Sequence, residues 1–106
     1  MMNIGLFGYG KMGKEIEAVA KQRSHAVSAI ADVDTNLADA KSLFEQCDSL
    51  IDFSVASGVP EHVRFAAEIK KPIVIGTTGW QDHLEEVKKT VDEAGIAAVV
   101  ASNFSL

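Results

Sequence analysis

A short apolar run near the start of the chain meets three glycines at the spacing G-x-G-x-x-G. This pattern is typical of a strand that turns sharply into a helix. The first glycine permits the turn, the second leaves room for a phosphate beside the backbone, and the third lets the helix pack closely on the sheet. A glycine turn without a ligand is the alternative, but a predicted strand precedes this one and a predicted helix follows it. Helix N-termini attract anions. We therefore predict a pyrophosphate site formed by Gly8, Tyr9, Gly10, Lys11, Met12 and Gly13.

Strand-like and helix-like segments alternate along the rest of the chain. We expect strands at 3–7, 26–31, 49–53, 73–75 and 97–101, and helices at 11–22, 57–70 and 82–94. Segment 35–46 fits either one short helix or a helix with a rudimentary strand. Ser57 is expected to cap the helix that contains Pro60, and Gly95 to end the last helix in a left-handed conformation. The alternation predicts an α/β fold, a Rossmann-type doubly wound parallel sheet that forms one domain over residues 1–106.

The composition excludes several classes of function. The 106 residues include 10 basic and 15 acidic side chains, for a net charge of −5, and no basic run exceeds two residues. Nucleic-acid binding is therefore not expected. Cys47 is the one cysteine and is interpreted as a packing residue, while His25, His62 and His83 are interpreted as surface residues, and no metal site is predicted. No leader or membrane-spanning segment is visible, so we expect a cytoplasmic location.

An acidic residue ends the second predicted strand. Asp32 lies 19 residues after Gly13, close to the spacing of the carboxylate that binds an adenosine ribose. A carboxylate accepts hydrogen bonds from the ribose hydroxyls and repels a 2′-phosphate. No arginine or lysine stands among residues 33–35, so NADH is the preferred cofactor and NADPH the second choice. The alternative is a solvated turn aspartate.

Small and polar residues follow the other strands. Ser54 follows the third strand, where Asp52 needs a hydroxyl or backbone N–H partner if it is buried. The turn Gly76-Thr77-Thr78-Gly79 follows the fourth strand; its hydroxyls either contact a nicotinamide or cap the next helix. Because parallel strands end at one edge of a sheet, we expect these groups to line a single site.

Four motifs occur in an order and spacing that resembles the 4-hydroxy-tetrahydrodipicolinate reductase family, also called dihydrodipicolinate reductase. They are Gly8–Gly13, Ile51-Asp52-Phe53-Ser54, Val74–Gly79 and Ala101-Ser102-Asn103-Phe104-Ser105. The resemblance covers the whole chain. It implies an oxidoreductase of lysine and diaminopimelate biosynthesis that transfers a hydride from NADH or NADPH to a cyclic dicarboxylate. It also implies that the nicotinamide end contacts Gly76, Thr77, Thr78, Ala101, Ser102, Asn103 and Phe104.

The chain departs from the family pattern in two respects. Its glycine loop is one residue shorter than the usual family form. The family also continues into a second domain, with a Glu-x-x-His-His motif, a lysine acid, a Ser-Gly-Thr clamp for the substrate and the interface of a homotetramer. We therefore expect no catalytic residue in this chain, weak NADH binding and no turnover. The alternatives are the cofactor domain of a homoserine or aspartate dehydrogenase, and a free-standing, non-catalytic NAD-binding module.

Overall fold

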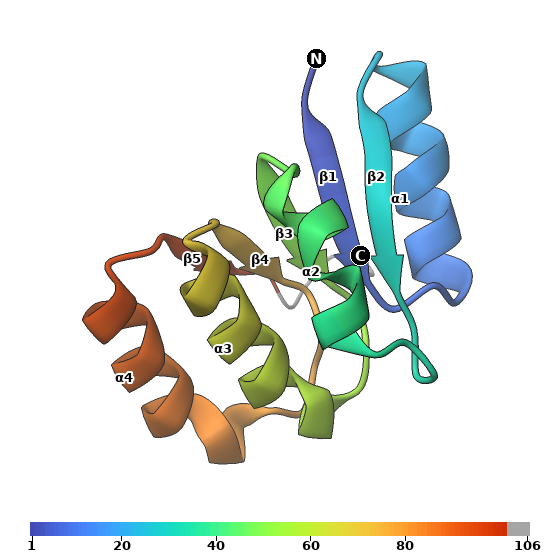
Figure 1. Ribbon diagram of the computed structural model, residues 1–106. Coiled ribbons are helices and arrows are strands. Elements are labelled where there is room, and N and C mark those ends of the chain that lie inside the picture. Colours follow the sequence, from blue (N-terminus) through green and yellow to red (C-terminus); the bar gives the residue numbers. More distant parts are fainter. Residues whose placement is uncertain (102–106) are drawn as a thin grey trace.

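The computed structural model describes residues 1–101, and within them the chain forms a five-stranded parallel sheet with helices on both faces (Figure 1). The strands are β1 (Asn3–Phe7), β2 (Ala26–Ala31), β3 (Ser49–Asp52), β4 (Ile73–Ile75) and β5 (Ala98–Val100). The helices are α1 (Lys11–Gln22), α2 (Leu37–Glu45), α3 (Val59–Ile69) and α4 (Leu84–Ala94), with 3-10 turns η1 (Ala56–Gly58) and η2 (Gln81–His83). The predicted α/β class is confirmed.

The direction of winding reverses once in the sheet, whose strand order is β2-β1-β3-β4-β5. The chain runs outward from β1 to β2, returns across β1 to β3, and then continues to β4 and β5. Right-handed crossovers therefore place α1 on one face and the other helices on the opposite face. The packing agrees: Phe7 of β1 lies in a cluster with Phe44 of α2, whereas its neighbour Leu6 packs with Ala20 of α1. The sheet is doubly wound, as predicted.

Three phenylalanine rings hold the larger core together. Phe7 and Phe44 stack with their centroids 5.1 Å apart, and the Phe65 ring meets both edge-on at 6.0 and 5.4 Å. Burying each ring contributes about 2–3 kcal/mol. Cys47 lies fully buried in the same core, and this burial raises the pKa of its thiol. Its interpretation as a packing residue is consistent with this position.

The structure resolves one local expectation, corrects a second and confirms a third. Segment 35–46 contains one helix, α2, which begins where the Asn36 side chain accepts a hydrogen bond from the Asp39 amide at 3.1 Å. The prediction that Ser57 caps α3 is wrong. A 3-10 turn absorbs Ser57, and Gly58 is the residue before the helix, without a side-chain cap. Gly95 adopts the expected left-handed conformation, with φ of 70°.

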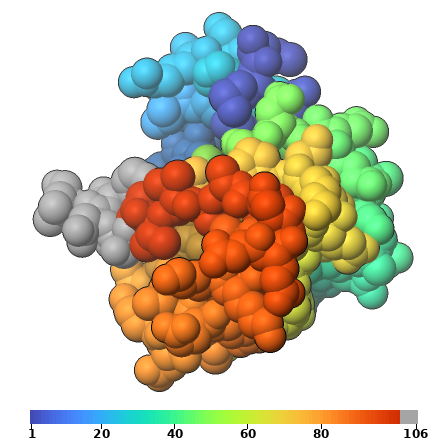
Figure 2. Space-filling model, turned by 90° about the vertical axis from the view of Figure 1, so that its left-hand side faces the viewer, coloured from blue at the N-terminus to red at the C-terminus, as the bar shows by residue number. Residues whose placement is uncertain are grey.

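The face of the sheet that carries α1 is only partly covered. A groove on this face is lined by Met12, Ile16, Ile51, Phe53 and Val74. Val99 of β5, which pairs with Val74, is 56% exposed. Figure 2 shows that α4 and β5 lie next to each other, at the end of the sheet formed by β5. On the other face, α2, α3 and α4 contribute to the larger apolar core, which also includes residues of β1, β3 and β4.

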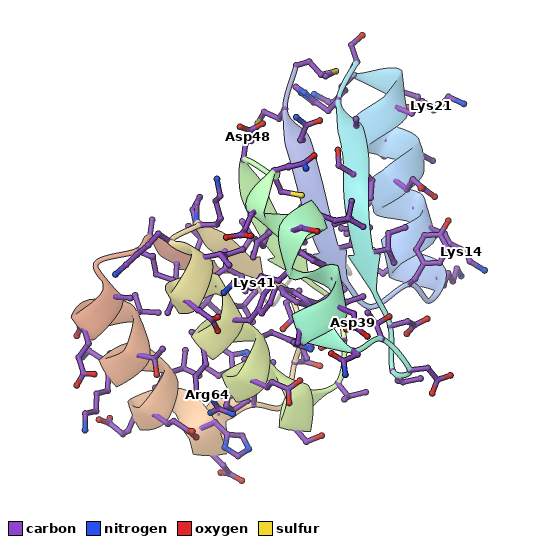
Figure 3. The ribbon with its side chains drawn as sticks, viewed as in Figure 1. Lys14, Lys21, Asp39, Lys41, Asp48 and Arg64 are labelled. Carbon is purple, nitrogen blue, oxygen red and sulfur yellow. The ribbon has the colours of Figure 1, made fainter. Side chains whose placement is uncertain are left out.

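Exposed ion pairs link the three helices of that better covered face. Lys41 of α2 contacts Glu68 of α3 at 2.6 Å, and Arg64 of α3 contacts Glu86 of α4 at 2.9 Å. Figure 3 shows Lys41 and Arg64 on the outer surfaces of their helices. The hydrogen bond to Glu68 raises the pKa of Lys41. Exposed pairs of this kind contribute at most about 1 kcal/mol each, so the apolar core provides most of the stability.

Candidate functional site

A cleft of about 400 Å³ opens at the carboxyl edge of the sheet. It lies where the winding reverses, which is where open α/β sheets bind their ligands. The segments after β1, β2 and β3 and the first turn of α3 contribute its walls. The lining residues are Gly8, Tyr9, Gly10, Ala31, Asp32, Val33, Thr35, Leu37, Phe53, Ser54, Val55, Gly58, Glu61 and His62. Three of the predicted strand ends therefore meet in one cleft.

The glycine turn has the geometry that its spacing predicts. Gly8 has φ of +94°, and a Cβ there would lie 2.4 Å from the carbonyl oxygen of Phe53. A Cβ at Gly13 would lie 2.6 Å from the Gly8 oxygen, so only glycine lets α1 start this close to the turn. A Cβ at Gly10 would meet no heavy atom of residues 1–101 within 4 Å. Gly8 and Gly13 thus serve the close packing, and Gly10 faces open space.

The start of α1 presents backbone donors without competing acids. Gly10 precedes the helix, its first turn holds no acidic residue, and no side chain of the described residues caps it. These N–H groups carry the positive end of the helix dipole, which suits an anionic group. Lys11 is exposed beside them, while the Met12 side chain lines the separate apolar groove on the α1 face.

The Tyr9 side chain lies over the first turns of α1. Its hydroxyl donates a hydrogen bond to Glu17, and this contact raises the Tyr9 pKa. The Lys14 ammonium lies 5.5 Å from the centre of the same ring, within cation–π range. Tyr9 therefore closes one side of the cleft through contacts with α1.

Asp32 is exposed at the end of β2 and lines the cleft. Its amide donates to the Thr35 hydroxyl at 2.9 Å, and its Oδ1 accepts from the Val33 amide at 3.0 Å. Oδ2 makes no hydrogen bond within residues 1–101. Among the lining residues that the structure describes, no lysine or arginine stands near this carboxylate. The site at Asp32 therefore offers an acceptor for hydroxyl groups.

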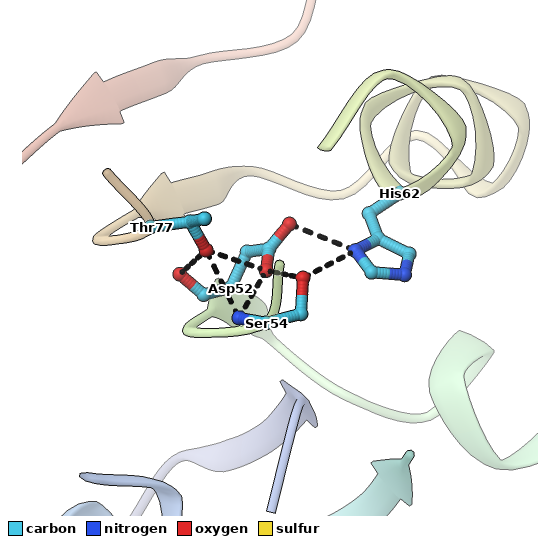
Figure 4. A network of polar contacts seen from close by, with 4 residues as sticks. All are labelled: Asp52, Ser54, His62 and Thr77. Carbon is cyan, nitrogen blue, oxygen red and sulfur yellow. Dashed lines mark hydrogen bonds and ion pairs between the residues drawn. The ribbon is translucent and has the colours of Figure 1, made fainter. Parts of the chain in front are cut away.

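The carboxylate of Asp52 is fully buried and takes part in a network of polar contacts with Ser54, His62 and Thr77 (Figure 4). Its Oδ1 accepts hydrogen bonds from the Ser54 amide at 2.9 Å, the Ser54 hydroxyl at 2.5 Å and the Thr77 hydroxyl at 3.0 Å. Its Oδ2 accepts from Nδ1 of His62 at 2.8 Å. The expected hydroxyl and backbone partners of Asp52 are confirmed, and its role is structural.

The threonine turn lies next to the cleft and is joined to it through Ser54. The Thr77 hydroxyl accepts from the Ser54 amide at 2.9 Å, and the amides of Gly76 and Thr77 donate to the Asp52 carbonyl. Thr77 is buried whereas Thr78 is exposed. Neither hydroxyl caps the following helical turn, which begins after Trp80 without a side-chain cap. The contacts of Gly76, Thr77 and Thr78 with a nicotinamide stay a prediction.

The last predicted contacts follow β5. The Ala101 amide donates to the Ile75 carbonyl at 2.9 Å and so extends the sheet toward the same edge. Ser102, Asn103 and Phe104 lie outside the described residues. Of the four residues after β5 that are predicted to line the nicotinamide, only Ala101 lies within the described residues.

The interpretation of His62 as a surface residue is wrong. Its side chain is 15% exposed, stacks on the Phe7 ring with centroids 4.2 Å apart, and lines the cleft. A sequence signal existed, because His62 lies on the same face of α3 as the apolar Val59 and Val63, and Asp52 required a donor.

Residues 1–101 contain no group of three or more side chains suited to hold a metal ion.

Comparison with known proteins identifies the relatives of this chain. The family described as "Dihydrodipicolinate reductase, N-terminus" matches residues 2–104. The 4-hydroxy-tetrahydrodipicolinate reductase of Christiangramia forsetii is 36% identical over 99% of the chain, and that of Campylobacter jejuni (strain 81-176) is 38% identical over 100% of it. The chain spans 43% of the length of each of these relatives.

Among solved structures, a protein named as a probable dehydrogenase from Thermotoga maritima is similar with a TM-score of 0.74. Its sequence identity is 18%, and the match covers 94% of this chain and 36% of that one. At this identity the likeness concerns the fold, which is the Rossmann-type fold predicted from the sequence.

Within residues 1–101, no helix has the length and hydrophobicity needed to span a lipid bilayer.

Gly8→Ala and Gly10→Ala form a matched pair that tests the turn. Gly8→Ala should lower the free energy of unfolding by at least about 2 kcal/mol, because it meets both a positive φ and a backbone clash. Gly10→Ala should change it by less than about 1 kcal/mol, since the added methyl group enters open space. Urea unfolding measures both, and equal effects would contradict this account of the turn.

Asp52→Ala should destabilise the fold by about 3 kcal/mol, because it leaves buried donors of Thr77, Ser54 and His62 without their acceptor. Asp34→Ala is the matched control: this carboxylate is exposed, and its loss should cost less than about 0.5 kcal/mol. Thermal unfolding of both variants makes the comparison. A melting temperature of Asp52→Ala equal to that of the control would contradict a structural role for the network.

Proposed function

The chain belongs to the dihydrodipicolinate reductase N-terminal family, and on this basis we propose that it holds the nicotinamide cofactor of such a reductase. The observation that carries the proposal is the meeting of the glycine turn, Asp32 and Ser54 in one cleft at the reversal of the sheet. Such a meeting of backbone donors and a carboxylate is what a dinucleotide requires. When bound, the cofactor supplies the hydride of the reduction.

The residues present fit the parts of a dinucleotide in order along the sheet edge. The pyrophosphate binds over Gly10, at the uncapped start of α1. The adenosine ribose donates hydrogen bonds to Asp32, whose Oδ2 is unoccupied by other groups of residues 1–101. The nicotinamide end extends past Ser54 toward the threonine turn and Ala101, which lie at the same edge.

The charges around Asp32 support NADH over NADPH. A 2′-phosphate on the ribose would face this carboxylate, and Glu61 adds a second negative charge to the described lining. Cofactors with a 2′-phosphate need a cationic partner, usually arginine. Val33, Asp34 and Thr35 supply none.

We propose that the reduction itself requires a longer protein than this chain. The relatives named 4-hydroxy-tetrahydrodipicolinate reductase are more than twice as long as the matched region. Binding of the cyclic dicarboxylate, proton donation and assembly into a tetramer are proposed to depend on the part of those proteins that this chain does not match. The proposed role of the described residues is to bind and orient the cofactor, in the cytoplasm.

Asp32→Ala should weaken NADH binding by about 1–3 kcal/mol, the cost of losing charge-assisted hydrogen bonds to the ribose. NADPH binding should weaken less, because removing the carboxylate also removes its repulsion of the 2′-phosphate. Isothermal titration calorimetry with both cofactors measures the two effects, and Asp34→Ala serves as the control. Equal losses for NADH and NADPH would contradict the assignment of Asp32 to the ribose.

This chain alone should bind NADH and show no turnover with 4-hydroxy-tetrahydrodipicolinate. Stabilising the transition state requires protein groups that contact the substrate as well as groups that hold the cofactor. NADH oxidation followed by absorbance tests this, with a full-length reductase from a relative as the positive control. Enzyme-like turnover by the 106-residue chain would show that it carries its own substrate site.

A further inference from the structure

The described lining of the cleft includes apolar side chains that follow two different strands, and we call this part of the cleft the slot. Val33, after β2, and Val55, after β3, both line the cleft and are 85% and 58% exposed. Leu37 of α2 also lines this part. Exposed valines are costly in water, and a flat apolar ligand bound in this part of the cleft would cover them. A purine ring attached to a ribose at Asp32 has this shape.

His62 lies at this slot with its orientation already determined. Its ring is stacked on Phe7 with an angle of 9° between the planes, and its Nδ1 lies 2.8 Å from Oδ2 of Asp52. A carboxylate only accepts hydrogen bonds, so Nδ1 carries the proton. In the neutral ring, Nε2 then has an unshared lone pair and acts as an acceptor.

The acceptor atom of His62 is available to a ligand. Figure 4 shows Nε2 on the side of the ring opposite Asp52 and Ser54. No group of residues 1–101 donates to it, and no buried side-chain nitrogen of the described chain lacks a partner, so solvent reaches this atom. The ring itself is largely buried, at 15% exposure. Nε2 is therefore a fixed acceptor at the surface of an apolar slot.

We propose that Nε2 of His62 accepts a hydrogen bond from the exocyclic amine of adenine and so makes the site specific for an adenine dinucleotide. This inference rests on the proposed function, since it places the base of the same cofactor. Adenine donates from its 6-amino group, whereas hypoxanthine presents a carbonyl oxygen at that position. Two acceptors facing each other repel, and the described lining of the cleft holds no lysine or arginine to compensate.

Glu61 is the competing acceptor in the described lining. It precedes His62 on α3, it is exposed, and its carboxylate also accepts hydrogen bonds. The side chain of Glu61 has no contact that fixes its position within residues 1–101, whereas His62 is held by both Asp52 and Phe7. A fixed acceptor discriminates between bases better than a mobile exposed one, because no rearrangement relieves the repulsion. His62 is therefore the specificity-determining residue.

The test compares NADH with reduced nicotinamide hypoxanthine dinucleotide by titration calorimetry. The unaltered chain should bind the hypoxanthine cofactor about tenfold more weakly. His62→Phe keeps a ring on Phe7 but lacks the acceptor; it should weaken NADH about tenfold and leave the hypoxanthine cofactor nearly unchanged, so that the preference disappears. Glu61→Gln should keep the preference.

A second variant decides the question if His62→Phe does not fold. In Gly58→Ala the new methyl carbon would lie 3.1 Å from Cε1 and 3.6 Å from Nε2 of His62, where it crowds the acceptor and leaves the Asp52 partner in place. It should reduce the preference for NADH severalfold. If either His62→Phe or Gly58→Ala folds and still prefers NADH over the hypoxanthine cofactor as strongly as the unaltered chain, the role of His62 is overturned.

The outcomes separate this inference from the proposed function. Equal affinity of the unaltered chain for both cofactors would overturn the role of His62 and leave cofactor binding intact. Loss of the preference in Glu61→Gln alone would assign it to Glu61 instead. Binding of neither cofactor would remove the proposed function, and the inference with it.

Discussion

The buried carboxylate of Asp52 is the interaction on which the cleft depends. A charge with no exposed surface is costly by several kcal/mol unless it is fully paired, since desolvation is large in the interior. Asp52 receives four donors, two from Ser54 and one each from Thr77 and His62. These donors come from the segment after β3, the segment after β4 and the start of α3. One carboxylate thus fixes two strand ends and a helix relative to each other.

The glycine turn depends on the same arrangement. Gly8 packs against the Phe53 carbonyl, and Phe53 stands between Asp52 and Ser54. The position of the turn therefore follows from the position of the segment that Asp52 holds. On the other side, the Gly8 amide donates to the Ala31 carbonyl at 2.7 Å and connects the turn to β2. The cleft is consequently built from three strand ends in mutual contact, and the side chain and amide of Asp32 bond to its near neighbours Val33 and Thr35.

Much of this arrangement could be predicted because it rests on local chemistry. The roles of Gly8 and Gly13 follow from glycine spacing, and the need of Asp52 for partners follows from its apolar strand. What could not be predicted rests on distant contacts. The sequence predicts that Ser57 caps α3, but Ser57 lies in a 3-10 turn that precedes this helix. His62 reads as a surface residue, and only the packing of α3 on β1 brings it against Phe7 and Asp52.

By itself, the sequence determined the alternation of strands and helices, the glycine turn and the acidic residue after β2, because periodicity, backbone freedom and residue spacing act over a few neighbouring positions. Tertiary structure alone decided the sheet order, the half-covered α1 face and the partners of Asp52. These features depend on which segments meet after the winding reverses. No short-range pattern encodes that meeting, since residues 23 or more positions apart, such as Ser54 and Thr77, come together only in the folded sheet.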